Sequence, residues 1–216
     1  MRIKNIHQNT YKHVIGLGKG RGVEQYSWLF GYSDNKDFKK FLLSSATFFL
    51  DDVRNMLFVK ARHSDLSWML NNNYIDIALG SSVWFNEKSK FKSFDFFNKE
   101  VKPCRLSLIS KTPLPIKDGL RVATRFIDIA NTYFDNKGIE VKLIPMNGCH
   151  ENALLLNFAD AIIDIIETGR TIKHLQLIEL EVLQYVSHKL YIKNTINATK
   201  IYKSLLDMIM EKKVSL

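Results

Sequence analysis

Residues 159–171 of the chain, ADAIIDIIETGRT, combine an apolar segment with a short polar turn. Isoleucine fills four positions of the apolar segment, which is typical of a strand covered on both faces. The turn at residues 167–171 follows at once, and its Gly169 allows the backbone to come close to a ligand. A helix that begins here would direct its free N–H groups at the same point, beside the hydroxyl groups of Thr168 and Thr171. The pattern predicts a phosphate site, or else an ordinary strand–turn–helix junction with a threonine N-cap.

Strands and helices alternate through the rest of the chain. Just before the turn segment, strands at 120–124 and 139–144 flank a helix at 127–137, which makes a βαβ unit. Further strands are predicted at 13–17, 48–50, 56–61, 74–79, 101–109, 177–186 and 190–193. Further helices are predicted at 23–29, at 65–72 with Ser64 as the N-cap, and at 196–212. This alternation predicts an α/β protein with mostly parallel sheet.

The composition limits the class of protein. The 216 residues suffice for one large domain or two small lobes, and 46% of them are hydrophobic. The sequence has no apolar run of about 18 residues, and residues 1–9 lack a signal-peptide pattern, so we expect neither a membrane span nor secretion. Cys104 and Cys149 lack the spacing of a disulfide scaffold or a metal site, which favours a reducing cytoplasm.

The formal net charge of +9 would suit nucleic acid, a polyanionic small molecule or an acidic partner. Much of this charge is lysine in segments such as residues 34–40, for which a solvated surface is the simpler explanation. The sequence has no RNA-recognition motif, zinc finger or continuous basic helix, so nucleic acid is not an expected partner.

Short motifs follow one another in a fixed order along nearly the whole chain. VATR ends a strand at 122–125, and Gly138 bounds the next helix. The motif residues after this helix are Gly148, Glu151, Ala153, Ala159, Asp160, Asp164, Thr168, Gly169 and Thr171. The remaining motifs are KGR at 19–21, RHSD at 62–65, DIALG at 76–80, CRL at 104–106, Ser187 and Asn194. In this order they resemble the motifs of ATP phosphoribosyltransferase, the first enzyme of histidine biosynthesis. The chain ends soon after its last predicted helix, as does the short, catalytic-subunit form of that family.

This resemblance implies two α/β lobes around a central cleft, like a type II periplasmic binding protein. Lobe one would contain residues 1–88 and 182–216. Lobe two, residues 89–181, would carry the phosphate turn. Ligands are then expected in the cleft, at the carboxyl ends of strands.

The resemblance also implies an enzyme that joins N1 of the ATP adenine to C1 of phosphoribosyl pyrophosphate and releases pyrophosphate. The 5′-phosphate would lie on the turn, which consists of Glu167, Thr168, Gly169, Arg170 and Thr171. The acceptors for the ribose hydroxyls would be Glu151, Asp160 or Asp164. The catalytic groups that stabilise the departing pyrophosphate would be Lys19, Arg21 and Arg62. Mg²⁺ would be held mainly by the substrate, and no protein metal ligands are expected.

Each candidate also has a structural interpretation. Asp160 and Asp164 lie on a strand that is expected to be buried, where an aspartate is rare unless it is paired or functional. Glu151 would suit the first turn of a helix for its interaction with the dipole alone. The glycine-rich segment at 19–21 would also form an ordinary tight turn, and Arg62 would also serve as a surface charge.

The segment 148–157, GCHENALLLN, departs from the family pattern G-S-x-E-x-A-P-x-x-G by losing its serine, its proline and its second glycine. This difference leaves an alternative, a catalytically silent or altered-specificity paralogue that binds nucleotides or regulates. For an active enzyme, the resemblance implies a homo-oligomer that works with a regulatory subunit resembling histidyl-tRNA synthetase.

Overall fold

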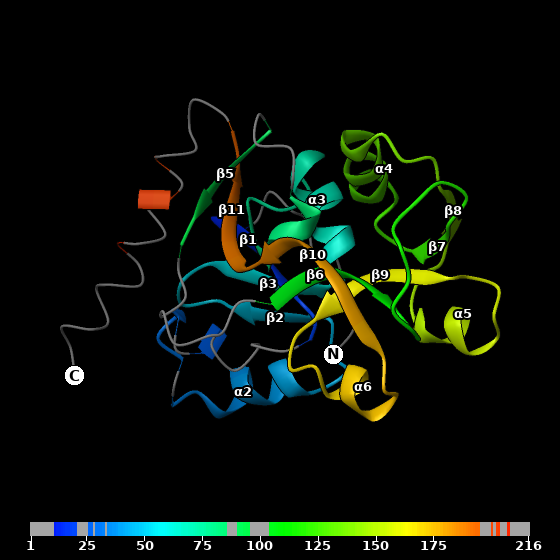
Figure 1. Ribbon diagram of the computed structural model, residues 1–216. Helices are drawn as coiled ribbons and strands as arrows, with labels where there is room; N and C mark the ends of the chain where they lie inside the picture. The colour runs from blue at the N-terminus through cyan, green and yellow to red at the C-terminus, as the bar shows by residue number, and fades with distance from the viewer. Residues whose placement is uncertain are drawn as a thin grey trace. The chain divides into compact units, whose positions relative to one another are not determined.

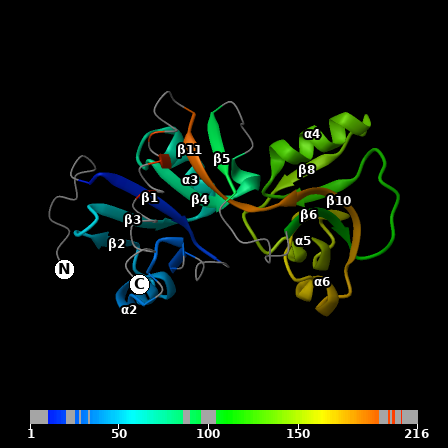
Figure 2. The same ribbon diagram turned by 90° about the vertical axis from the view of Figure 1, so that its left-hand side faces the viewer.

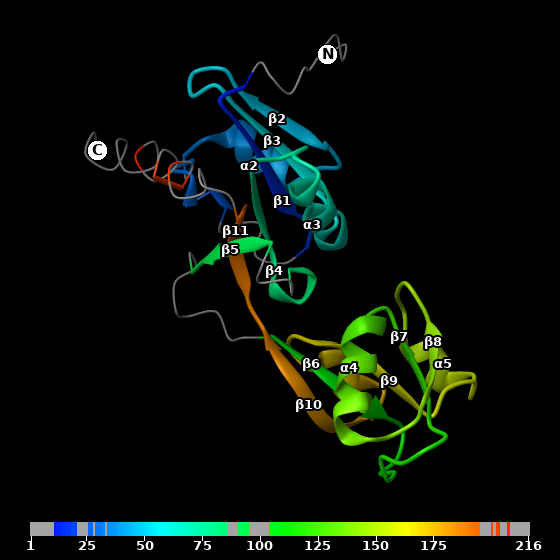
Figure 3. The same ribbon diagram turned by 90° about the horizontal axis from the view of Figure 1, so that it is seen from above.

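The computed structural model describes residues 11–20, 26–27, 29–32, 34–85, 90–95, 104–194, 200, 202, 203 and 207. The chain divides into two compact units, which we call unit one (Met1–Val101 with His188–Leu216) and unit two (Lys102–Ser187) (Figure 1). It leaves unit two between strands β10 (Ile178–Val186) and β11 (His188–Lys193), a path that Figure 3 shows. Each unit is built around its own sheet.

Unit one contains a six-stranded sheet in the order β2-β3-β1-β4-β11-β5. Besides β11, its strands are β1 (His13–Gly18), β2 (Phe48–Asp51), β3 (Met56–Ala61), β4 (Ile77–Ser81) and β5 (Phe91–Phe94). Its helices include α2 (Lys36–Leu43), α3 (His63–Asn71) and the 3-10 turn η2 (Ser82–Trp84).

Strand β1 lies between β3 and β4, and its sequence explains this position. All six of its residues are buried. Ile15 and Leu17 pack into the apolar cluster that contains the buried residues of α2, whereas Val14 joins Leu66 and Leu70 of α3. Because successive side chains of a strand point to opposite faces, a strand that is apolar on both faces belongs inside a sheet that has a helix on each side.

Unit two contains a five-stranded sheet in the order β10-β6-β9-β7-β8. Strand β7 (Arg121–Thr124), helix α4 (Ile127–Lys137) and strand β8 (Lys142–Pro145) form the predicted βαβ unit, and α4 ends at Gly138 with a φ of 65°. Strand β9 (Ala161–Ile166) lies between β6 (Cys104–Ser110) and β7, and four of its six residues are buried. The short helices α5 (Glu151–Leu155) and α6 (Arg170–His174) lie on one face of this sheet and α4 on the other (Figure 2).

The expectation of mostly parallel sheet is wrong. Among the strand pairs of the described ranges, five are antiparallel and four are parallel. Strands β2 and β3 are joined by a turn too short for a crossover, which makes them antiparallel. Strand β6 runs against both β10 and β9, and β11 runs against both β4 and β5. The parallel pairs are those of β1 with β3 and β4, and of β7 with β8 and β9.

The structure also differs locally from the prediction at one helix cap and at two elements that the sequence pattern did not indicate. Ser64 is not the N-cap of α3, because the helix begins two residues earlier than predicted, at His63, with Arg62 as the cap. Helix α2 was not predicted, although the side chain of Asn35 caps it by accepting the N–H of Phe38 at 2.9 Å. Strand β5 was not predicted either, since its sequence FKSF has no clear apolar period. Most of the predicted helices at 23–29 and 196–212 lies outside the described residues.

The limits of the two units differ from those of the predicted lobes. The prediction places residues 89–181 in lobe two, whereas β5 pairs with β11 in unit one. It places residue 182 and those that follow in lobe one, whereas residues 182–186 continue strand β10 alongside β6 in unit two. In the part of the chain that the structure describes, no helix has the length and apolar character needed to cross a membrane.

Candidate active site

The turn after β9 has an unusual backbone at its glycine. Strand β9 ends at Ile166, and Gly169 lies in the left-handed region, with a φ of 71°, as the N-cap of α6. A Cβ atom at Gly169 would meet Cγ2 of Ile166 at 4.0 Å, an ordinary contact distance, and the glycine itself is half-buried. Thr168 and Thr171 are exposed. The threonine N-cap is therefore wrong, because the glycine occupies that position.

Asp164 lies in the carboxyl half of β9 and pairs with a histidine from the loop after β8. Its Oδ2 atom is 2.9 Å from Nδ1 of His150, and the two side chains are 34% and 2% exposed, respectively. Nε2 of His150 is 3.2 Å from the carbonyl oxygen of Met146. Oδ1 of Asp164 accepts the N–H of Ile165 at 2.7 Å. These contacts fix the carboxylate of Asp164, yet a third of the side chain remains open to solvent.

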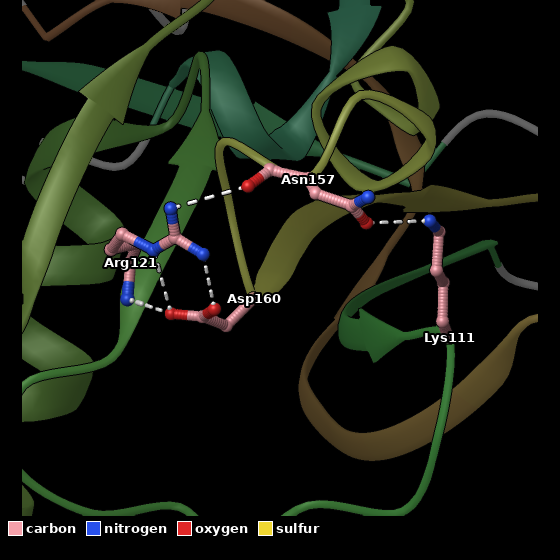
Figure 4. A network of polar contacts seen from close by, with 4 residues as sticks. All are labelled: Lys111, Arg121, Asn157 and Asp160. Atoms are coloured by element: carbon pink, nitrogen blue, oxygen red, sulfur yellow. Dashed lines mark hydrogen bonds and ion pairs between the residues drawn. The ribbon is translucent and has the colours of Figure 1, made fainter.

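Asp160 precedes the first residue of β9 and pairs with the first residue of β7. Its Oδ2 accepts the backbone N–H of Arg121 at 2.9 Å and Nε–H at 3.1 Å, and its Oδ1 accepts Nη2–H at 2.6 Å. Arg121 also donates to the carbonyl of Asn157 at 3.2 Å, and the Asn157 side chain accepts from Lys111 at 2.9 Å (Figure 4). The hydrogen bond from Arg121 lowers the pKa of Asp160.

The structure therefore separates Asp160 from the turn. The length of β9 lies between them, about 20 Å at roughly 3.3 Å per residue. The ion pair of Asp160 with Arg121 joins the amino ends of β9 and β7. Ligands of α/β sheets bind at the opposite, carboxyl ends of the strands. Asp164 and the turn lie toward the carboxyl end of β9. The contact of Asp164 with His150 brings the start of α5, which includes the half-buried Glu151, toward the same strand.

In unit one, Lys19 and Arg62 follow directly after two neighbouring parallel strands. Gly18 of β1 pairs with Ala61 of β3, and the N–H of Lys19 donates to the carbonyl of Ala61 at 2.9 Å. The two exposed cationic residues therefore start from adjacent points at one edge of the sheet. Burial lowers the pKa of Lys60 in β3, and the positive charge of Lys19 lowers it further. Arg21 lies outside the described residues.

Two histidines at these edges were not identified as site residues from the sequence. His63 is the first residue of α3, and its Nδ1 accepts the N–H of Ser81, the last residue of β4, at 3.2 Å. Its ring fills the space that a side chain at Gly18 would need. His150 is the partner of Asp164, but 14 residues separate the two. No local pattern indicates either contact, because each joins segments that meet through the sheet.

Comparisons with known proteins agree with the order of the motifs. A sequence model of the family described as ATP phosphoribosyltransferase, HisG, matches residues 62–212. An ATP phosphoribosyltransferase of Bacillus cereus is 31% identical over 191 residues, which cover 88% of this chain and 84% of the relative. One of Geobacillus kaustophilus is 29% identical over 181 residues, which cover 83% of this chain and 86% of the relative.

Solved structures confirm the predicted fold class, two α/β lobes of the type II periplasmic-binding-protein kind. An ATP phosphoribosyltransferase (HisG:HisZ) complex from Thermotoga maritima matches with a TM-score of 0.68 and 22% identity, over 92% of this chain and 99% of that chain. The periplasmic aliphatic sulphonate binding protein SsuA from Escherichia coli matches with a TM-score of 0.54 and 14% identity, over 92% of this chain and 71% of that chain. At such identities these likenesses concern the fold alone. The family match spans most of the sequence and the Bacillus relative aligns with nearly all of it, so this chain belongs to the ATP phosphoribosyltransferase family.

Proposed function

We propose that the chain catalyses the reaction of its family with the turn at residues 167–171 as the seat of the 5′-phosphate of phosphoribosyl pyrophosphate. The observation that supports this placement most is the left-handed Gly169 after β9, where a Cβ atom would make only an ordinary contact with Ile166. Successive backbone N–H groups in such a turn form a concave anion site. The exposed hydroxyl groups of Thr168 and Thr171, together with Arg170, would supply further donors and positive charge.

The ribose hydroxyls would be bound by Asp164, with Glu151 as the second acceptor. A carboxylate has about four acceptor positions, and the contacts of Asp164 with His150 and Ile165 use two of them. We do not expect Asp160 to bind the ribose, because it lies at the other end of β9 and its carboxylate accepts three hydrogen bonds from Arg121.

Lys19, Arg62 and Arg21 would stabilise the pyrophosphate as it leaves. Negative charge develops on this group in the transition state, so fixed positive charge there lowers the barrier. The adjacent starting points of Lys19 and Arg62 at the edge of the unit-one sheet support this role. Mg²⁺ would arrive with the substrate, coordinated by pyrophosphate oxygens and water, as this ion prefers.

The solved structure from Thermotoga maritima is of a HisG:HisZ complex. We propose that this chain likewise works with a regulatory subunit resembling histidyl-tRNA synthetase, and that it forms a homo-oligomer. As an enzyme of amino-acid biosynthesis it would act in the cytoplasm.

The reaction is tested by measuring product formation from ATP and phosphoribosyl pyrophosphate, with the chain alone and with a HisZ-type subunit. We expect turnover with ATP and none with GTP or free adenine. Turnover with another purine in place of ATP would contradict the proposed acceptor. Binding of phosphoribosyl pyrophosphate without any turnover would instead support the silent or regulatory paralogue, which the named relatives do not favour.

The placement of the 5′-phosphate has its own test. Thr168→Val with Thr171→Val should raise the dissociation constant of phosphoribosyl pyrophosphate about tenfold or more, as expected for lost hydrogen bonds to a charged group. Thr132→Val is the matched control, because this exposed threonine lies on α4 and its hydroxyl donates to the carbonyl of Asp128. Equal affinities of the double variant and of Thr132→Val, measured by titration calorimetry, would exclude the two threonine hydroxyl groups from the phosphate site.

A further inference from the structure

His150 is buried where the loop after β8 meets β9, the strand that leads to the candidate site. It precedes α5 and is 1% exposed, although Cys149 before it is exposed and has a φ of 50°. One ring nitrogen faces the carboxylate of Asp164 on β9, and the other faces the carbonyl of Met146, which follows β8 directly. The ring thus connects the loop after β8 to the strand that ends in the turn.

Both partners of the ring are hydrogen-bond acceptors. A neutral imidazole carries one N–H and can satisfy one of them, whereas the imidazolium ion carries two and satisfies both. Burial alone would lower the pKa of His150, but the hydrogen bond and charge of Asp164, with the carbonyl of Met146, outweigh burial and raise it. Arg125, after β7, opposes this rise. The adjacent ionisable residues on its own segment are Cys149 and Glu151.

We propose that His150, as an imidazolium ion, is a positioning residue for the phosphoribosyl pyrophosphate site. This role rests on the proposed function. Nδ1–H holds Oδ2 of Asp164, so the carboxylate keeps one orientation toward the ribose, and Nε2–H holds the loop after β8 against β9. Pre-ordering of this kind lowers the cost of binding, since the groups that contact the ligand are fixed beforehand.

The two contacts make the site sensitive to pH in one direction. Because the pKa of His150 in the folded protein lies above its ordinary value, both hydrogen bonds are present below that ordinary value. As the pH rises through the raised pKa, the ring loses a proton and gives up one of the two bonds. The affinity for phosphoribosyl pyrophosphate should therefore fall as the pH rises through this range.

The test uses two amide variants, each of which keeps one of the two N–H donors of the imidazolium ion. The side-chain nitrogen of Asn reaches roughly the place of Nδ1, and that of Gln roughly the place of Nε2. His150→Asn should therefore keep the bond to Asp164, and His150→Gln should keep the bond to Met146. His174→Asn is the control, because this histidine is exposed at the end of α6 close to the turn.

Calorimetry of the full chain with Mg²⁺ and phosphoribosyl pyrophosphate, from about pH 6 to about pH 9, gives the result. We expect the ratio of the wild-type dissociation constant to that of His150→Asn to rise about tenfold from the lower to the higher pH. The asparagine has no proton to lose in this range, so its own contacts do not change with pH. His150→Gln should be about tenfold weaker than His150→Asn throughout. Titration of the substrate phosphate is common to all the proteins and cancels in these ratios.

Two results would overturn the role of His150. In the first, both amide variants bind phosphoribosyl pyrophosphate with the same affinity, and the same dependence on pH, as the wild type and His174→Asn. The other, which does not depend on folded variants, is a ¹⁵N spectrum of the wild type in which the His150 ring is neutral at about pH 6. A wild-type chain that binds no phosphoribosyl pyrophosphate at any pH would instead refute the proposed function, whatever the state of the ring.

Discussion

Two aspartates four residues apart, Asp160 just before β9 and Asp164 in its carboxyl half, have different partners in the structure. At the amino end, Arg121 supplies three hydrogen bonds to Asp160 from its backbone and guanidinium. At the carboxyl end, Asp164 accepts two hydrogen bonds, from His150 and from the backbone of Ile165. Both carboxylates are 34% exposed, so exposure does not distinguish them. What distinguishes them is the end of the strand and the number of acceptor positions left for a ligand, and we infer that Asp160 stabilises the fold while Asp164 serves the site.

The largest effect is expected beyond the carboxyl end, at the turn. Gly169→Val should weaken the binding of phosphoribosyl pyrophosphate by about a hundredfold or more, because a β-branched side chain fills the open approach and is strained at positive φ. Titration calorimetry measures the loss. Gly138→Val imposes a similar strain at a φ of 65°, at the end of α4. Equal affinities in the two folded variants would remove the turn from the site.

Asp164→Asn tests the carboxyl end of the strand itself. The amide keeps the size of the side chain but removes the charge that faces His150 and that we propose binds the ribose. We expect about a tenfold rise in the dissociation constant of phosphoribosyl pyrophosphate, comparable to a hydrogen bond with a charged partner. The affinity for ATP should change less than twofold, roughly the scatter of such comparisons. An unchanged dissociation constant for phosphoribosyl pyrophosphate would show that Asp164 does not contact the sugar.

Asp160→Asn makes the same chemical change at the amino end and should have the opposite result. Affinity should stay within about twofold of the wild type, whereas Tm should fall by about 2 to 4 °C, as expected for a partly exposed ion pair. Circular dichroism during heating gives Tm, and calorimetry gives the affinity. If this variant lost the ligand and kept its Tm, the roles of the two ends would be reversed.

The smallest effect is the pH dependence of that difference in Tm. Arg121 lowers the pKa of Asp160 in the folded protein, so its stabilising contribution is present above the ordinary carboxyl pKa of 3.8. The contribution is lost as the pH falls through the lowered value. The Tm of the wild type should therefore exceed that of Asp160→Asn at neutral pH and approach it in acid. A difference that grows on acidification would contradict the direction of this pKa shift.

Much of the fold follows from local patterns that the sequence displays. The apolar run of β9, the βαβ unit around α4 and the glycine of the turn depend on side-chain period and turn chemistry within a few residues. The antiparallel pairing of β6 and β11 with their neighbours could not be predicted from local patterns, because strand pairing joins segments that are far apart in the chain. Helix α2 was also missed, since its capping residue Asn35 stands before a lysine-rich segment that resembles a solvated surface.

By itself the sequence determined the family, through the order of its motifs, and the position of the turn, through Gly169 and its threonines. Tertiary structure alone decided which partners Asp160 and Asp164 have. Arg121 lies 39 residues before Asp160, and His150 lies 14 residues before Asp164. No local period relates residues at such separations. Each pair forms because the sheet of unit two brings β7, β8 and β9 side by side. The direction of β9 then leaves Asp160 at its amino end and Asp164 nearer the turn.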